Sequence, residues 1–151
     1  MQIQTDSPDK PDITALLHEH LTDMYATSPA ECVHALDIIR LLRPEITFYS
    51  CRADSGLLGC AALKDLGNNR GELKSMRTAI NARNQGVAVA LLRHIIQAAT
   101  QRCYSALLLE TGTMEYFEPA RQLYAKMGFS HCGPFAHYEE NPNSTFMQLI
   151  L

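Results

Sequence analysis

A hydrophobic stripe in the middle of the chain stands between two segments that resemble strands. Hydrophobic residues recur at spacings of three and four from Ala88 to Ala99, which predicts a helix with one face packed on a sheet. The strand-like segment 72–77 precedes this helix, and the hydrophobic run 106–109 follows it. Short hydrophobic runs of this second kind are typical of buried strands with parallel neighbours. The order strand, helix, strand therefore constrains the chain to a sheet that is covered by a helix.

The rest of the chain extends this unit at both ends. Asp54-Ser55-Gly56 joins two strand-like runs as a β-hairpin, and Ser28-Pro29-Ala30-Glu31 has the N-cap serine, early proline and third-position glutamate of a helix start. Predicted strands lie around Ile3, at 46–52, 57–63, 72–77 and 106–109, and twice within 129–151; predicted helices lie at 12–26, 29–42, 88–99 and 119–127. The predicted fold class is α+β, or α/β in three layers, with a mixed, mainly antiparallel sheet and helices on both faces.

Length and charge exclude several classes of protein. The 151 residues suit one compact domain, which we expect to span residues 1–151. Lys and Arg number 13 against 16 Asp and Glu, so no overall basic field attracts nucleic acid or an anionic membrane. No hydrophobic run approaches the roughly 20 residues that span a bilayer, and the N-terminus lacks the hydrophobic core of a signal peptide. We therefore expect a cytoplasmic protein.

The cysteines and histidines show no metal-binding or disulfide pattern. The five cysteines are odd in number and contain no Cys-x-x-Cys pair, so we expect reduced, mostly buried thiols. The six histidines include no His-x-x-x-His or comparable pair, so no metal site is expected. His20 lies on the hydrophobic stripe of the first helix, where we expect a satisfied core or edge histidine.

The loop that leads into the central helix is a candidate phosphate-binding site. Residues 83–88 read Arg-Asn-Gln-Gly-Val-Ala, and a helix start exposes backbone N–H groups that an anion approaches closely beside a glycine. The P-loop pattern is absent, and a dinucleotide-binding pattern needs three glycines, whereas residues 81–89 contain only Gly86. The alternative interpretation is a helix N-terminus with a tight-turn glycine and no ligand.

Two motifs resemble those of the GCN5-related N-acetyltransferases (GNAT). Arg83-x-x-Gly86-x-Ala88 is similar to the acetyl-CoA loop of that family, usually Gln/Arg-x-x-Gly-x-Gly/Ala. Ala120-x-x-Leu123-Tyr124-x-x-x-Gly128-Phe129 is similar to the motif that carries a tyrosine near the coenzyme sulfur. The resemblance covers essentially the whole chain. It implies a GNAT-like sheet in which the strands at about 72–77 and 106–110 are parallel and splay apart.

A closer likeness points to a bacterial subgroup of uncharacterised acetyltransferases. It lies in Glu72-Leu73-Lys74-Ser75-Met76-Arg77, in Leu109-Glu110-Thr111-Gly112 and in Asn141-Pro142-Asn143-Ser144-x-Phe146-Met147. The subgroup implies no particular acceptor substrate.

The resemblance implies acetyl-CoA as co-substrate and places it in the splay. Backbone N–H groups of the loop, with Arg83 at the rim, would hold the pyrophosphate. Pantetheine would lie along the end of the 72–77 strand, bound by backbone groups of Met76 and Thr78, and the same edge would present an N–H to the thioester oxygen. The family commonly has an asparagine where this chain has Phe117, so that contact is either lost or apolar. The predicted coenzyme-binding residues are Met76, Arg77, Thr78, Arg83, Asn84, Gln85, Gly86, Val87, Ala88 and Phe117.

Acetyl transfer to an amine also needs an acid and a base. The resemblance favours Tyr124 as the general acid, because a phenol hydroxyl can protonate a departing thiolate; the alternative is a core tyrosine. An amine with a pKa of about 10 is mostly protonated at neutral pH, so a carboxylate or histidine must accept its proton. Glu72, Glu110 and His34 are the candidate bases, and each is alternatively an ordinary surface or structural group. The candidate aromatic walls of the site are Tyr116, Phe117, Phe135 and Tyr138.

The sequence therefore predicts an acetyl-CoA-dependent N-acetyltransferase. Its partner is an amine acceptor, either a small molecule or a protein amine, and transfer is direct within a ternary complex. The alternatives are an acyl-CoA sensor of the same fold without catalysis, and an interaction protein without coenzyme. A hydrophobic strand at 146–151 offers a surface for a homodimer.

Overall fold

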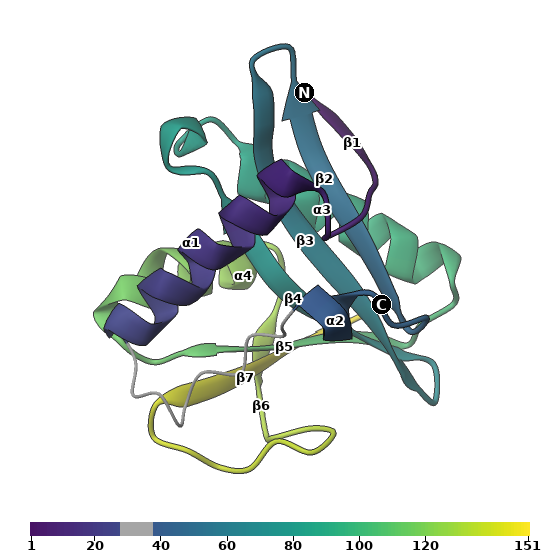
Figure 1. Ribbon diagram of the computed structural model, residues 1–151. Coiled ribbons are helices and arrows are strands. Elements are labelled where there is room, and N and C mark those ends of the chain that lie inside the picture. The colour runs from purple at the N-terminus through teal and green to yellow at the C-terminus, as the bar shows by residue number, and fades with distance from the viewer. Residues whose placement is uncertain (28–37) are drawn as a thin grey trace.

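One seven-stranded mixed sheet runs through the molecule, in the order β1-β2-β3-β4-β5-β7-β6 (Figure 1). The computed structural model describes residues 1–27 and 38–151. The strands are β1 (Gln2–Thr5), β2 (Ile46–Ala53), β3 (Gly56–Gly67), β4 (Arg70–Thr78), β5 (Ala106–Gly112), β6 (Ser130–Cys132) and β7 (Ser144–Ile150). Neighbouring strands are antiparallel except for β4 and β5, which are parallel. The predicted mixed, mainly antiparallel sheet is confirmed.

Helices cover both faces of the sheet. They are α1 (Pro11–Thr27), α2 (Ile38–Leu41), α3 (Val87–Gln101) and α4 (Glu118–Lys126), with short 3-10 turns η2 (Ile80–Ala82) and η3 (Glu115–Phe117). In Figure 1, α1 and α2 lie in front of the sheet, and α3 lies behind it. One buried cluster joins α1 and α2 to the front of β2 and β3, and a larger cluster joins α3 and α4 to the back of the sheet.

The parallel pair of β4 and β5 separates after three residue pairs. Arg70, Gly71 and Glu72 pair with residues 106–108, whereas β4 continues to Thr78 and β5 to Gly112. The predicted splay is confirmed. The two strands diverge toward the end of the sheet at which α3 begins.

A β-bulge in β4 lies inside the splay. Cys60 pairs with Arg77 and Ala62 pairs with Lys74, so Ser75 and Met76 face Ala61 alone. Ser75 has a φ of 53°, in the left-handed region that serine rarely adopts. The sequence did not predict this bulge.

Close packing fixes the N-terminus of α3 against β3. A Cβ added at Gly59 would lie 2.8 Å from the Val87 side chain and from the Arg77 carbonyl oxygen, so glycine permits this approach. The stripe that predicted the helix faces the sheet, with Leu91, Leu92 and Ile95 fully buried. The helix start is therefore held rigidly at the mouth of the splay.

Other predictions from the sequence are confirmed or corrected at the level of single segments. The hairpin around Asp54-Ser55-Gly56 is confirmed. The predicted helix at 29–42 is described only from Ile38, and its remainder lies outside the described residues. The expectation of mostly buried thiols is wrong for Cys103, which is exposed in the turn after α3, and for half-buried Cys132. Cys32 lies outside the described residues.

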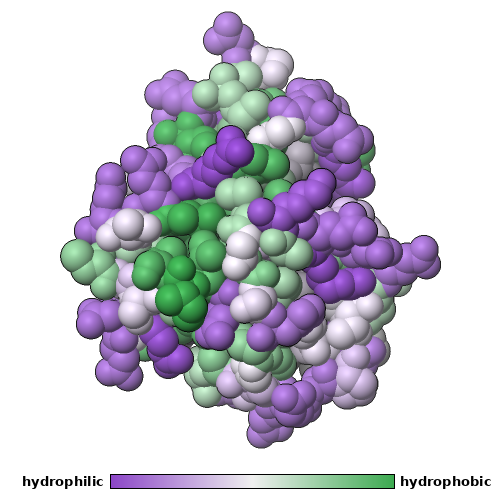
Figure 2. Space-filling model, turned by 180° about the vertical axis from the view of Figure 1, so that it is seen from behind, coloured by the Kyte–Doolittle hydropathy of each residue, from purple (hydrophilic) through white to green (hydrophobic). Residues whose placement is uncertain are grey.

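The C-terminal strand ends on an exposed hydrophobic edge. β6 pairs only with residues 146–148, so β5 is the one neighbour of the end of β7 among the described strands, and Ile150 and Leu151 are exposed. Figure 2 shows hydrophobic side chains gathered on the rear face, at the side of the molecule where the chain ends in Figure 1. The homodimer contact expected there stays a prediction. Within the described residues, no helix is long and hydrophobic enough to cross a membrane.

Candidate active site

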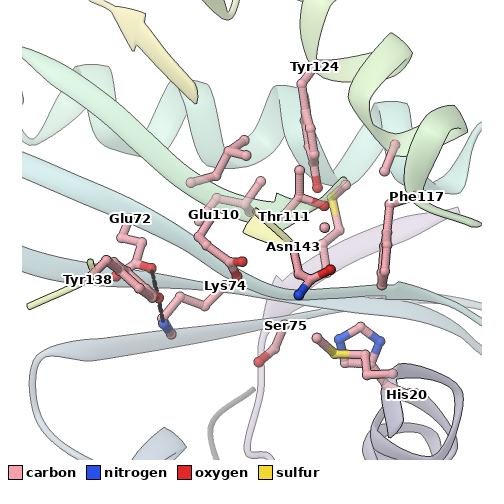
Figure 3. Close-up of a pocket in the computed structure, with 16 residues that line it drawn as sticks. His20, Glu72, Lys74, Ser75, Glu110, Thr111, Phe117, Tyr124, Tyr138 and Asn143 are labelled. Atoms are coloured by element: carbon pink, nitrogen blue, oxygen red, sulfur yellow. Dashed lines mark hydrogen bonds and ion pairs between the residues drawn. The ribbon is translucent and has the colours of Figure 1, made fainter. Parts of the chain in front are cut away.

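Two adjoining cavities open where β4 and β5 separate. The larger, which we call the outer groove, has a volume of about 490 Å³ and runs from the start of α3 to α4. The smaller, which we call the inner pocket, has a volume of about 120 Å³ and lies in the splay itself (Figure 3). Both cavities are lined by His20, Met76, Phe117, Ala120 and Tyr124. The shared walls make the two cavities parts of one site.

The start of α3 forms one end of the outer groove. Gly86 caps the helix with a φ of 80°, and its cap position carries no side-chain hydrogen bond. The first intrahelical bond runs from the Ala90 N–H to the Gly86 carbonyl, so the N–H groups of the first turn remain available to a ligand. A Cβ added at Gly86 would meet nothing within 4 Å, which leaves the cradle open. This geometry suits an anion.

All but one of the predicted residues of the coenzyme loop line the outer groove. Arg83, Asn84, Gly86, Val87 and Ala88 line the outer groove, as do Met76, Arg77 and Thr78 of β4. Gln85 does not line it, because its exposed side chain turns back and donates a hydrogen bond to the Asn81 carbonyl at 3.2 Å.

Arg77 ties β4 to α1. Its buried guanidinium forms ion pairs with Glu19 at 2.5 Å and Asp23 at 2.7 Å. It also donates to the Tyr116 hydroxyl at 3.3 Å, and that hydroxyl donates to Asp23 at 3.2 Å. The Arg77 hydrogen bonds and Coulomb attraction hold the pKa of Asp23 below its usual value, against an opposing effect of burial. The Arg77 side chain therefore anchors α1 over the site.

Phe117 forms an apolar wall between the two cavities. A Cβ added at Gly112 would overlap the Phe117 ring, so only glycine at the end of β5 allows the ring this position. Arg121 holds the intervening loop by donating to the carbonyls of Gly112 at 2.6 Å and Met114 at 3.0 Å.

Tyr124 projects from α4 into the inner pocket. Its ring packs on Phe129 with centroids 5.8 Å apart, and its hydroxyl points into the cavity (Figure 3). Burial raises the pKa of Tyr124 well above its usual range, and the nearby Glu110 raises it further. The phenol therefore stays protonated at neutral pH and offers a proton to the pocket.

Glu72 is held in a closed triangle of hydrogen bonds. Its Oε2 accepts from the Lys74 ammonium at 3.0 Å and from the Tyr138 hydroxyl at 2.7 Å. Lys74 also donates to the Tyr138 oxygen at 2.8 Å. The side chains of Glu72 and Lys74 are only 2% and 6% exposed. The carboxylate of Glu72 is thus a buried, fully engaged counterion.

Glu110 has a different environment on the neighbouring strand. Its carboxyl group points into the pocket beside Lys74 (Figure 3). Burial raises the pKa of Glu110 to about 7; Ser144 and Lys74 oppose this shift, and Glu72 adds to it. A carboxyl group with a pKa near neutrality can accept a proton from a ligand and release it to solvent.

The bulge at Ser75 gives the pocket a backbone wall that sequence reasoning missed. A bulged residue is left out of the strand ladder, so its backbone groups can serve a ligand. A serine in mid-strand carries no sequence signal for this conformation. The backbone N–H groups of Ser75 and Met76 are therefore candidates for the donor expected at this edge of β4.

His20 lies at the junction of the two cavities rather than in the core. Burial lowers its pKa to about 4; Arg77 lowers it further, and Asp23 opposes the shift. The imidazole is therefore neutral at physiological pH. His34, the histidine among the candidate bases, lies outside the described residues.

Three further residues of the inner pocket were not predicted from the sequence: Lys74, Ser75 and Asn143. Tyr138, one of the predicted aromatic walls, also lines it. Phe135 lines neither cavity but packs against the Tyr138 ring at 5.1 Å. Among the described residues, no group of three or more metal-ligating side chains comes together.

Known proteins with similar sequences support the same interpretation. Residues 13–129 match the model of the acetyltransferase (GNAT) family. The chain is 48% identical over 147 residues to "Uncharacterized N-acetyltransferase YsnE" of Bacillus subtilis, covering 97% of each chain. It is 47% identical over 149 residues to "Uncharacterized N-acetyltransferase YedL" of Escherichia coli, covering 99% of this chain and 94% of the relative.

A solved structure shows the same fold. A Bacillus subtilis acetyltransferase in complex with CoA superimposes with a TM-score of 0.73 at 16% identity, covering 99% of this chain and 98% of the other. The family match spans most of the chain, and the relatives match it nearly end to end. The chain therefore belongs to the acetyltransferase (GNAT) family and is an N-acetyltransferase.

Proposed function

We propose that this N-acetyltransferase moves an acetyl group from acetyl-CoA directly to a primary amine in a ternary complex. One observation carries the proposal: the outer groove begins at an open helix start and leads, through shared walls, to a pocket that holds a protonated phenol and a basic carboxyl group. The Bacillus subtilis acetyltransferase of the same fold was solved in complex with CoA.

The outer groove provides a place for each part of the coenzyme. The N–H groups at the start of α3 bind the pyrophosphate, with Arg83 at the rim. The edge of β4 at Met76 and Thr78 binds pantetheine, and Phe117 forms an apolar contact. A helix terminus contributes only about 0.3 to 2 kcal/mol, whereas micromolar binding needs about 8 kcal/mol. Most of the affinity therefore comes from the length of the groove.

The inner pocket provides the groups for the chemistry. Glu110 accepts the proton of the acceptor ammonium, and the neutral amine then attacks the thioester carbon. A backbone N–H at the β4 bulge stabilises the oxyanion. As the carbon–sulfur bond breaks, Tyr124 donates its proton to the thiolate, and the resulting phenolate takes up the second proton of the attacking nitrogen, so that a neutral amide and a thiol are formed. Glu110 suits the base role better than Glu72, whose carboxylate is occupied by Lys74 and Tyr138.

Thiol release in the presence of amines tests this function. The protein is incubated with acetyl-CoA and a panel of amines, and free CoA thiol is measured against a sample without amine. We expect at least one amine to raise thiol release well above hydrolysis, and calorimetry to show CoA binding. Binding without release would identify an acyl-CoA sensor, and absence of binding would contradict both roles.

A further inference from the structure

The inner pocket has an unusual balance of charge. Among the described residues, two carboxyl groups and one amine line this pocket: those of Glu72, Glu110 and Lys74. Lys74 is the one cation among the described lining residues, because His20 is neutral. A negatively charged group on an acceptor would therefore need Lys74 as its partner for an ion pair.

Lys74 is already neutralised. Glu72 lies 3.0 Å from its ammonium, and the Tyr138 hydroxyl bridges the two charged groups at 2.7 and 2.8 Å. This pair is buried, so water screens it weakly. A ligand carboxylate that paired with Lys74 would also meet the like charge of Glu72, which lies 3.0 Å from the same ammonium.

The other cations near the site are engaged with α1 or lie at the groove rim. Arg77 is paired with Glu19 and Asp23 on α1. Arg83 lies on the outer groove, 4.0 Å from Asp23, where it faces the coenzyme. Neither lines the inner pocket.

The ammonium group of an acceptor is attracted to the pocket, whereas a carboxylate is not. Glu110 faces the cavity without an ion pair of its own among the described residues, and Glu72 adds negative potential behind it. The pocket therefore attracts an amine and repels a carboxylate attached close to that amine.

We propose that the acceptor is an amine without a carboxylate on its amine-bearing carbon, and that Glu72 determines this specificity by neutralising Lys74. The proposal rests on the proposed function and names the chemical class of its acceptor. Alkylamines, arylalkylamines and side-chain amines of proteins belong to this class, whereas the α-amines of free amino acids do not.

Matched pairs of acceptors test the preference. Tyramine and L-tyrosine, histamine and L-histidine, and 3-methylbutylamine and L-leucine differ within each pair by one carboxylate. We expect kcat/KM for the amine to exceed that for the amino acid by at least about 100-fold, the scale expected for uncompensated like charges. Calorimetry on the CoA-loaded protein gives the same comparison as binding. An amino acid that reacts or binds as well as its amine, or pairs of which neither member binds, would overturn the proposal.

Charge variants test the role of Glu72. Glu72→Gln keeps the size and the acceptor oxygen but leaves Lys74 uncompensated, so we expect the amino-acid-to-amine ratio of kcat/KM to rise at least about 10-fold. Glu72→Gln/Lys74→Met removes both charges and should lose that gain. Lys74→Met alone should lower the ratio below the wild-type value. An unchanged ratio in all three variants would refute the assignment of Glu72, and CoA affinity and melting temperature report whether each variant folds.

These results separate the specificity from the function itself. Preference for the amino acid with thiol release intact would reject the specificity alone. If CoA binds but no acceptor causes thiol release, acetyl transfer is rejected. The binding comparison would then still decide whether the pocket prefers the amine or the amino acid.

Discussion

At the scale of single residues, two carboxyl groups in one pocket have different properties because their neighbours differ. Glu72 is an engaged counterion, whereas Glu110 is buried beside fewer partners, and its pKa is raised to about 7. The proposed mechanism depends on this difference. Glu110 can exchange a proton at neutral pH, and Glu72 sets the electrostatic potential around it.

The pH dependence of kcat/KM should report Glu110. Only the ionised carboxylate accepts a proton, so we expect the rate to rise with pH through about 7, the pKa to which burial raises this group. Glu110→Gln should lower kcat/KM by about 100-fold and remove this limb of the profile. Glu72→Gln, the matched change on the neighbouring strand, should keep this limb but move it to lower pH, because the Glu72 charge raises the pKa of Glu110. A profile that is unchanged in Glu110→Gln would assign the ionisation to another group.

Tyr124→Phe should separate catalysis from binding. The change removes one hydroxyl and keeps the packing of the ring on Phe129. We expect kcat to fall by about 100-fold, because the thiolate then leaves without its acid, while the dissociation constant for CoA stays the same. Steady-state kinetics and calorimetry measure the two quantities. Full turnover in this variant would make Tyr124 a core residue only.

The sequence was sufficient to identify the candidate acid and bases, but not to decide which carboxyl group suits the base role. Tyr124, Glu72 and Glu110 were identified from motifs and position. The choice depends on Tyr138, which lies 66 positions from Glu72 in the chain and contacts it only after folding. The left-handed φ of Ser75 is likewise imposed by strand pairing rather than by the residue type.

At the scale of elements, local periodicity was sufficient to predict most helices and strands. The stripe from Ala88 to Ala99 and the hairpin around Gly56 are local patterns, and both are confirmed. Strand lengths were less well predicted: β3 extends to Gly67 and β5 to Gly112, because pairing with neighbouring strands continues beyond the hydrophobic runs. Long-range partners decide where a strand ends.

The start of α3 can be tested with two glycines of similar conformation. Gly86→Glu adds a negative charge and a side chain where the coenzyme pyrophosphate approaches, so we expect CoA to bind at least about 10-fold more weakly. Gly67→Glu is the control: Gly67 has a φ of 78°, against 80° for Gly86, and is equally open, but it lies at the opposite end of β3. Both variants should lose similar stability, and only the first should lose affinity. Equal affinities would rule out the helix start as the pyrophosphate site.

At the scale of the whole molecule, a buried aspartate joins the N-terminal strand and α1 to the sheet. Asp6 follows β1, and its side chain is 1% exposed. It accepts hydrogen bonds from Ser50 at 2.6 Å and Arg52 at 3.2 Å, and it pairs with Lys10 at 2.6 Å. Arg52 also pairs with Asp12 in the first turn of α1. This cluster fixes the near end of the helix whose far end carries His20 and Asp23.

Asp6 should contribute stability that is lost in acid. Burial raises its pKa, but the hydrogen bonds from Lys10, Ser50 and Arg52 outweigh this and hold the pKa well below its usual value. The contribution is therefore complete above the unfolded pKa of about 4 and declines as the pH falls toward the folded value. Asp6→Asn should cost about 2 kcal/mol at neutral pH, or about 4 to 8 °C in melting temperature.

Thermal unfolding over a range of pH checks this prediction. The difference between wild type and Asp6→Asn should shrink below about pH 4. Asp54→Asn, in the exposed hairpin turn, should show no such difference at any pH. A constant difference for Asp6→Asn would mean that its ionisation is not what stabilises the fold.

The bulge in β4 also determines which side of the sheet each later residue faces. Glu72 and Lys74 point to one side, and Leu73 packs into the core on the other. Simple alternation would send Met76 to the side of Lys74 and Arg77 to the side of Leu73. The extra residue inverts this phase: Met76 packs on the core beneath α3, and Arg77 reaches α1. Deleting Ser75 alone would therefore pair Met76 with Ala61 in a regular ladder and leave Arg77 facing α1, so the change would remove the unpaired backbone groups of the bulge while keeping α1 tied to the sheet.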